Sequence, residues 1–166
     1  MTRRFKTVSS LQHHLRDSIV NSIRNQVADV CIRVVQENLR ERVYDSYIPQ
    51  GEFAYDRTYE LLNSVTIGNI DIGTKYITFE IFMDTDKINA YRTGDGEWNQ
   101  HGDIQYIQDV SEYIPLWVEE GTSGSLWDRD GSHYMEASHY ELSGGQLARA
   151  LSDALRSKGW SVTQIS

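Results

Sequence analysis

The apolar positions near the start of the chain repeat with the spacing of one long amphipathic helix. They occur at steps of four and three residues, at Leu11, Leu15, Ile19, Ile23, Val27, Val30, Val34 and Val35. Such steps place side chains on one face of an α-helix. Ser9, Ser10 and Gln12 offer a capping box for the first turn, and a proline follows at position 49, where a helix cannot continue. We predict a helix from about Ser9 to Tyr47.

This helix is too long for the core of one small domain to cover. About 38 residues at 1.5 Å each give a rod of roughly 55 Å. We therefore expect part of its apolar stripe to pack against another copy of the chain or against another protein.

The middle of the chain predicts a small antiparallel sheet. One or two helical turns are expected within 57–64, followed by a β-hairpin of Val65–Ile70 and Tyr76–Met83. In the second strand one face carries Ile77, Phe79, Ile81 and Met83. Residues 84–103 show no periodicity, and we predict that Asp84–Asp103 is a long inserted loop.

The C-terminal part predicts shorter elements. Pro115 favours the first turn of a short helix, and Gly121 favours its end. After a turn-rich loop over 122–132, His133–Tyr140 is expected to be a short strand or an extended linker. An amphipathic helix follows Gly144 and Gly145 and ends near position 159, and a final edge strand is predicted from the alternation of Trp160, Val162 and Ile165. The sequence thus predicts an α+β fold: a single domain over 1–166, with a long N-terminal helix packed on a small antiparallel β-sheet with shorter helices.

Composition narrows the class of protein. The 166 residues suit one domain, and 39% apolar residues are typical of a folded chain. The single cysteine, Cys31, cannot form a disulfide within the chain. No apolar run approaches the ~20 residues of a membrane helix, and polar residues follow the basic N-terminus where a signal peptide would be apolar. We expect a protein of a cytoplasm-like compartment without a membrane contact.

The charge of −8 is unevenly distributed along the chain. Residues 1–42 carry a net charge of +4, residues 43–142 carry −14, and residues 143–166 carry +2. This pattern disfavours a nucleic-acid groove built from the whole domain. Two interpretations stay open: a solvated acidic surface beside basic helices, or surfaces of opposite sign that meet across copies of the chain.

Candidate catalytic and metal-binding residues are few. His133, Glu136 and His139 lack the spacing of a helical zinc motif, and Cys31 within the apolar stripe favours a buried small side chain. Adjacent carboxylates at Glu119 and Glu120 have no acid or base partner in the sequence. We therefore predict no catalytic residues, no metal and no cofactor.

Three short segments, read in chain order, carry a resemblance to a known family. They are Arg57–Val65, Tyr113–Thr122 and His133–Ala137. With the long helix, the hairpin and the C-terminal helix around them, the chain resembles the tail-completion (head-to-tail joining, neck) proteins of long-tailed bacteriophages over about Leu11–Lys158. Two features depart from the family: Tyr59 stands where a glycine is usual, and the insertion 84–103 is longer than usual.

The resemblance implies a structural virion protein of the neck, assembled in the host cytoplasm. Similar proteins form rings, commonly six-fold, between a portal-side adaptor and the tail tube or tail terminator, and DNA passes through the ring without specific binding. Six or twelve copies both stay open. We expect the interface residues to be Tyr91, Trp98, Trp117, Glu119 and Glu120.

Two other classes of function stay open beside the neck protein. One is a non-virion regulatory or interaction module that uses the long amphipathic helix. The other is an enzyme that acts through Glu119, Glu120 or the region of His133 and His139.

Overall fold

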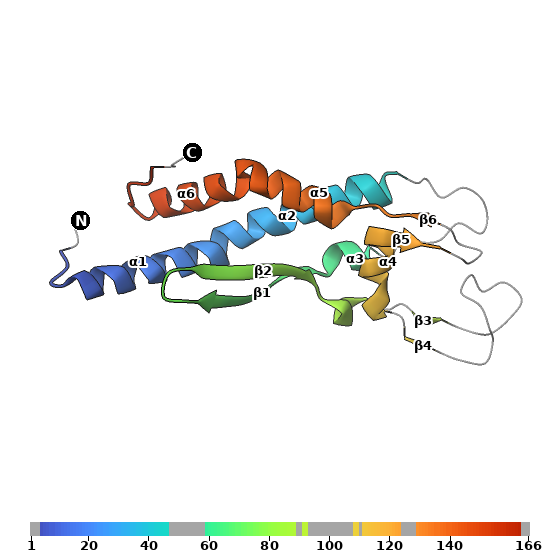
Figure 1. The fold of residues 1–166 in the computed structure, drawn as a ribbon, viewed down its shortest axis with the longest axis horizontal. Coiled ribbons are helices and arrows are strands. Elements are labelled where there is room, and N and C mark those ends of the chain that lie inside the picture. The colour runs from blue at the N-terminus through green and yellow to red at the C-terminus, as the bar shows by residue number, and fades with distance from the viewer. Residues whose placement is uncertain are drawn as a thin grey trace, which may run out of the picture. The chain divides into compact units, whose positions relative to one another are not determined.

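The computed structural model describes residues 4–46, 59–88, 91–92, 108–109, 111–123 and 129–163. Its elements form the predicted α+β fold, with a long N-terminal helix, a two-stranded antiparallel sheet and shorter helices (Figure 1). They belong to two compact units: unit 1 has residues 1–34, 67–81 and 139–166, and unit 2 has residues 35–66 and 82–138. That residues 1–166 fold as one cooperative domain stays a prediction.

The long helix is confirmed, and two of its turns are π-helical. It comprises α1 (Val8–Ser22), the π-turn η1 (Ile23–Val27), α2 (Ala28–Leu39) and the π-turn η2 (Arg40–Tyr44). It ends at Tyr44, three residues before the predicted Tyr47.

The predicted capping box at the start of this helix is displaced. Thr7 is the N-cap in an extended conformation, and Ser10 reciprocates three residues later. The Ser10 amide donates to Thr7 Oγ1 at 3.1 Å, and the Thr7 amide donates to Ser10 Oγ at 3.3 Å. A serine therefore fills the place usually taken by Glu or Gln, which is why the prediction centred on Gln12 was wrong.

The predicted stripe is correct in its middle and wrong towards the N-terminus. Of its members, Ile23, Val27, Val34 and Val35 are buried, Ile19 and Val30 are half-buried, and Leu11 and Leu15 are exposed. The buried residues of the long helix outside the predicted stripe include small and polar ones: Ser18, Ser22, Ala28, Cys31, Asn38, Leu39 and Tyr44. A π-turn closes with i→i+5 hydrogen bonds and so changes the phase of the side chains that follow it. A stripe extrapolated at constant period therefore loses register with the buried face.

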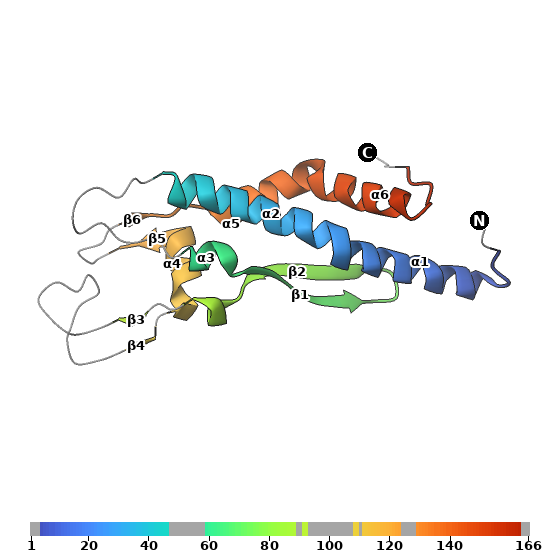
Figure 2. The same ribbon diagram turned by 180° about the vertical axis from the view of Figure 1, so that it is seen from behind.

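In unit 1 the α1–η1 helix, the hairpin and the C-terminal helix lie side by side (Figures 1 and 2). The hairpin consists of β1 (Val65–Ile72) and β2 (Ile77–Met83). Residues 65–66 at the start of β1 and residues 82–83 at the end of β2 belong to unit 2. The predicted face of β2 is confirmed, since the burial of its residues alternates from Ile77 to Met83. The C-terminal helix α6 spans Leu147–Ser157.

The core of unit 1 joins these three elements. Val27, Cys31 and Ala154 are its buried centre. Partly buried apolar side chains pack around it: Phe79, Ile81, Leu142, Leu147 and Leu151. The break predicted at Gly144 and Gly145 is a kink within the π-turn η5 (Leu142–Gln146), where Gly145 has φ 113°. Residues other than glycine rarely adopt this conformation.

The predicted final edge strand is not formed over the described residues 160–163, and Ile165 lies outside the described residues. Instead, the Trp160 ring lies 5.7 Å from the His14 ring of α1, and the Val162 carbonyl accepts a hydrogen bond from Arg156 at 3.1 Å. These contacts hold residues 160–163 against helices of unit 1. The alternation of apolar and polar residues there arises without pairing to another strand.

Unit 2 contains short elements. They are α3 (Glu60–Asn63), η3 (Thr85–Lys87), β3 (Tyr91–Arg92), β4 (Gln108–Asp109), η4 (Ser111–Tyr113), α4 (Ile114–Glu120), β5 (Gly121–Thr122), β6 (Arg129–Asp130) and α5 (Tyr134–Glu141), the end of which belongs to unit 1. The helical turn at 57–64 and the short helix from Pro115 to Gly121 are confirmed.

Two predicted loops of unit 2 contain antiparallel pairs of strands at their ends. The predicted insert 84–103 is not a loop throughout, since it begins with η3 and contains β3. Tyr91 and Arg92 of β3 pair with Asp109 and Gln108, which lie beyond the predicted end of the insert. Ile88, near the start of the insert, is buried with 6% exposure. Across the loop predicted at 122–132, Gly121 pairs with Asp130. The pairs are too short to produce the alternation from which a strand is predicted.

The prediction of a strand or linker at His133–Tyr140 is wrong, because α5 is a helix. Its buried residues Tyr134 and Ser138 are one helical turn apart. The Ser138 hydroxyl donates to the Tyr134 carbonyl at 2.6 Å. The buried positions that repeat with the period of a helix are therefore a tyrosine and a serine, which a search for aliphatic residues at helical spacing does not find.

Candidate interaction site

In the described part of unit 2, three exposed apolar side chains gather on α4 and the turn before it. Tyr113, Leu116 and Trp117 are 47%, 50% and 38% exposed. Their spacing of three and four residues places them on one face of the helix. The rings of Tyr113 and Trp117 stack, with centroids 5.6 Å apart and an interplanar angle of 20°. We call these three residues the α4 aromatic face.

Acidic side chains accompany the α4 aromatic face. Glu112 and Glu120 are both exposed. Glu112 precedes Leu116 by four residues, and Glu120 follows Trp117 by three, spacings that make each glutamate a neighbour of the α4 aromatic face along a helical surface. The site thus combines apolar area with negative charge.

The helix that carries this face is supported by a buried tyrosine. Tyr134 is 1% exposed, and its hydroxyl donates to the Pro115 carbonyl in the first turn of α4 at 3.5 Å. Burial, together with the nearby Glu119 and Tyr44, raises the pKa of Tyr134 well above its ordinary value of 10. The phenol therefore stays protonated and keeps its donor.

The C-terminal end of α4 is joined to the start of α5 by a set of hydrogen bonds. Glu119 Oε2 accepts from the Met135 amide at 2.9 Å, and Glu119 Oε1 accepts from the Glu136 amide at 3.1 Å. A carboxylate at a helix N-terminus satisfies unpaired N–H groups and opposes the helix dipole. The Ser132 amide and hydroxyl donate to the Val118 carbonyl at 2.9 and 2.6 Å.

The chain passes close to α4 at Gly131. A Cβ atom there would lie 2.4 Å from the Glu119 carbonyl oxygen. Only glycine allows this approach. The α4 aromatic face is therefore presented by a helix that is held at both ends.

The structure places the five predicted interface residues differently. Trp117 and Glu120 lie on the exposed surface of α4, whereas the Glu119 carboxylate is engaged inside unit 2 as a helix cap. Tyr91 lies in β3, and Trp98 lies outside the described residues. Sequence reasoning missed Tyr113 and Leu116, although their spacing from Trp117 is the signal that could have found them.

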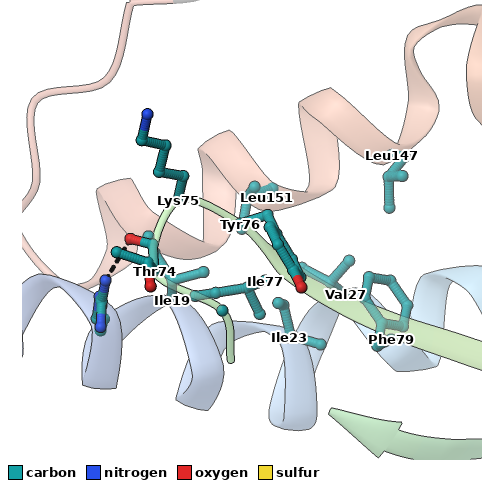
Figure 3. A pocket seen from close by; sticks show the side chains of 12 residues that line it. Ile19, Ile23, Val27, Thr74, Lys75, Tyr76, Ile77, Phe79, Leu147 and Leu151 are labelled. Carbon is teal, nitrogen blue, oxygen red and sulfur yellow. Dashed lines mark hydrogen bonds between the residues drawn. The ribbon is translucent and has the colours of Figure 1, made fainter. Parts of the chain in front are cut away.

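Unit 1 contains a pocket of about 430 Å³ between α1, η1, the hairpin and α6 (Figure 3). Its lining is mostly apolar and includes Ile19, Ile23, Ile77, Phe79, Leu147 and Leu151. Arg16 also lines it and donates to the Thr74 carbonyl in the hairpin turn. In Figure 3 the Lys75 amine points away from the apolar side chains. The pocket thus has an apolar interior and basic residues in its lining.

The candidate chemical residues do not assemble a site in the described part of the chain. No three His, Cys, Asp or Glu side chains there could hold a metal ion together. His133 Nδ1 lies 3.6 Å from Glu136 Oε2, and both side chains are exposed. Burial raises the pKa of the Cys31 thiol, which disfavours the reactive thiolate. None of the helices in the described ranges has the length and apolar character needed to cross a membrane.

Fold and site together define an α+β protein with an exposed aromatic and acidic helix. The sequence model of the YomN family matches residues 7–157. The chain therefore belongs to the YomN family, whose members are phage-derived proteins of the Bacillus-prophage type. The predicted association with bacteriophages is confirmed at this level. Comparison with curated proteins and with solved structures found no match.

Proposed function

We propose that this phage protein is a structural component of the virion neck. Copies of the chain form a ring, six-fold as the resemblance implies, that joins the portal-side adaptor to the tail tube or tail terminator and lets DNA pass. The observation that carries the proposal is the α4 aromatic face. Tyr113, Leu116 and Trp117 place apolar area on a firmly held helix, and aromatic residues are enriched where proteins bind one another.

Charge supports the passage of DNA through such a ring. Unit 2 contains six Lys and Arg against eighteen Asp and Glu, a formal net charge of −12. A surface of this sign repels phosphates and opposes tight binding. DNA could then move along the ring without being held by it.

Deletion of the coding sequence from the phage tests the proposal. We expect electron micrographs of the lysate to show filled heads and complete tails that are not joined, and expression of the intact chain from a plasmid to restore joining. Mass spectrometry of purified wild-type particles should find the chain, and its ratio to the portal protein gives the copy number. Normal infectious particles from the deletion phage would refute the proposal.

A second candidate is a non-virion interaction module that uses the long helix. The exposure of Leu11 and Leu15 near the start of α1, 38% and 36%, favours it, because these apolar side chains share one helical face and keep more than a third of their surface open to solvent. The same mass measurement separates the candidates. A neck protein remains in purified particles in fixed ratio to the portal protein, whereas a regulatory module is absent from them.

A further inference from the structure

The two units of the chain carry opposite charge. Unit 1 has ten Lys and Arg against six Asp and Glu, a formal net charge of +4, whereas unit 2 has a net charge of −12. Surfaces of opposite sign attract one another over about a Debye length and orient approaching molecules. When two copies of this chain meet, contact between unit 1 of one copy and unit 2 of the other is therefore favoured over contact between two copies of unit 1 or two copies of unit 2.

Each unit also carries half of an apolar contact. Unit 1 has the pocket of about 430 Å³, a volume within the usual range for binding pockets, about 300–1,000 Å³. Unit 2 has the α4 aromatic face, which projects a stacked tyrosine and tryptophan with a leucine beside them. An aromatic anchor that fills an apolar pocket is the arrangement in which binding energy concentrates.

The charges at these two places match the charges of the units. Arg16 and Lys75 belong to the pocket, and Lys75 is exposed in the hairpin turn. Glu112 and Glu120 accompany the α4 aromatic face. Two α4 faces in contact would bring four carboxylates together, and two pockets would bring basic groups together. The matching arrangement is pocket against α4.

We propose that the unit 1 pocket of one copy binds the α4 aromatic face of a second copy, with Lys75 facing Glu120. This inference rests on the proposed function, which supplies the second copy as the occupant. Because the two surfaces differ, the contact is heterologous, and its repetition produces a ring when the rotation closes and a filament when it does not.

Sedimentation velocity of the purified full-length chain tests the apolar part of the contact. Trp117→Ala should weaken self-association by about tenfold or more, as expected for a central aromatic anchor. Tyr140→Ala is the matched control, since Tyr140 is 82% exposed on α5 and outside both surfaces. Circular dichroism should find both variants folded. Equal association of the two variants would overturn the proposal, as would a wild-type chain that stays monomeric at every soluble concentration.

Charge reversal tests the pairing. Lys75→Glu and Glu120→Lys should each reduce self-association, and an equimolar mixture of the two variants should recover it, because every pocket then faces an α4 of opposite sign. Recovery in the mixture supports the contact of the pocket with α4 through Lys75 and Glu120. Two variants that associate as the wild-type chain does, or a mixture no better than either variant alone, would contradict it.

The result for the contact is separate from the result for the neck protein. Suppose that the chain is present in purified particles and that neither Trp117→Ala nor charge reversal changes its self-association. This result refutes the proposed contact and leaves the proposed function standing. A chain that associates through the contact but is absent from purified particles supports the contact and refutes the neck role.

Discussion

At the scale of single residues, four serines occupy buried positions on the helices. Ser18, Ser22, Ser138 and Ser152 are all buried. Each hydroxyl donates to the carbonyl four residues earlier, at 2.6 to 2.8 Å. The polar group is thereby satisfied within its own helix, and burial leaves no donor unpaired. These small side chains therefore act as core positions, although a hydropathy pattern counts them as polar.

Glu119 tests whether a predicted interface residue acts within the fold. We expect Glu119→Ala to lower the free energy of unfolding by about 1 kcal/mol, because the amides of Met135 and Glu136 lose their acceptor at the start of α5. Glu120→Ala, at the exposed neighbour, is the control and should leave stability nearly unchanged. Urea unfolding monitored by circular dichroism measures both. A Glu119→Ala variant as stable as the wild-type chain would show that the cap contributes nothing.

The raised pKa of Tyr134 predicts a loss of stability in alkali. The buried phenol keeps its proton when tyrosines of the unfolded chain lose theirs, so above about pH 10 the native state binds more protons than the unfolded state. Stability should then fall with rising pH by up to about 1.4 kcal/mol per pH unit from this group. The contribution is absent below pH 9, where both states are protonated.

Thermal unfolding at a series of pH values checks this prediction. In the Tyr134→Phe variant the alkaline fall in Tm should be shallower than in the wild-type chain. Tyr140→Phe alters an exposed tyrosine and should keep the wild-type slope. The same slope in all three proteins would mean that Tyr134 ionises as freely in the folded chain as in the unfolded one.

At the scale of elements, Val27 is the strongest test of the core. It is 1% exposed and forms the buried centre of unit 1 together with Cys31 and Ala154. Val27→Asp should lower the free energy of unfolding by several kcal/mol, because a buried carboxylate there has no counter-charge among the residues of the core cluster. Val27→Ala should lose less, on the order of 1–3 kcal/mol.

The matched control for Val27 is on the same π-turn. Gln26 is exposed, so Gln26→Asp adds the same charge without burying it and should stay close to wild-type stability. Chemical unfolding of the three variants gives the comparison. If Val27→Asp and Gln26→Asp were equally stable, the core of unit 1 would have to be placed elsewhere.

How far the sequence could predict these elements depends on the range of the interactions that form them. The alternation in β2 and the apolar steps in α6 are local signals, and both elements were predictable. The helix α5 was not, since its first turn is capped by Glu119, sixteen residues before Met135 in the sequence. Trp160 and Val162 alternate like a strand, yet the structure offers them helix contacts instead of a strand partner.

The candidate site divides in the same way. Trp117 could be found as a large aromatic residue among acidic ones, and Glu120 lies beside it. The roles of Glu119 and Gly131 could not be found, because both depend on α5 and the strand before it returning to α4. The pocket likewise combines α1, the hairpin and α6, which are far apart in the sequence.

At the scale of the whole molecule, folding turns the alternation of basic, acidic and basic segments along the chain into two units of opposite sign. The basic ends of the sequence both enter unit 1, together with the tip of the hairpin. Unit 2 collects most of the acidic middle. Charge separation on this scale increases the rate of association between copies and makes it dependent on salt, which connects the sequence pattern to the proposed assembly.

The insert supplies the last prediction, on assembly. Its base is held by Ile88, which is buried, and by the pairing of Tyr91 with Asp109. Replacing residues 93–107 with a two-residue Asn-Gly turn keeps this base, and such a turn suits an antiparallel pair. Because the free energy of loop closure changes slowly with length, we expect a change in stability of only about 1 kcal/mol. The shortened chain should fold, with an unchanged circular dichroism spectrum.

In the phage, the shortened chain should fail to join heads to tails, because it lacks Trp98, the large aromatic residue that we assigned to contacts with a neighbouring subunit or ring. Trp98→Ala alone should reduce the yield of infectious particles, whereas Tyr140→Ala, remote from the insert in sequence and exposed on α5, should not. Plaque titre and electron microscopy of the lysates give the comparison. If the shortened chain yields joined and infectious particles at the wild-type titre, the insert has no part in joining, and the contacts that hold the neck together must lie on α4 and the described surface of unit 1.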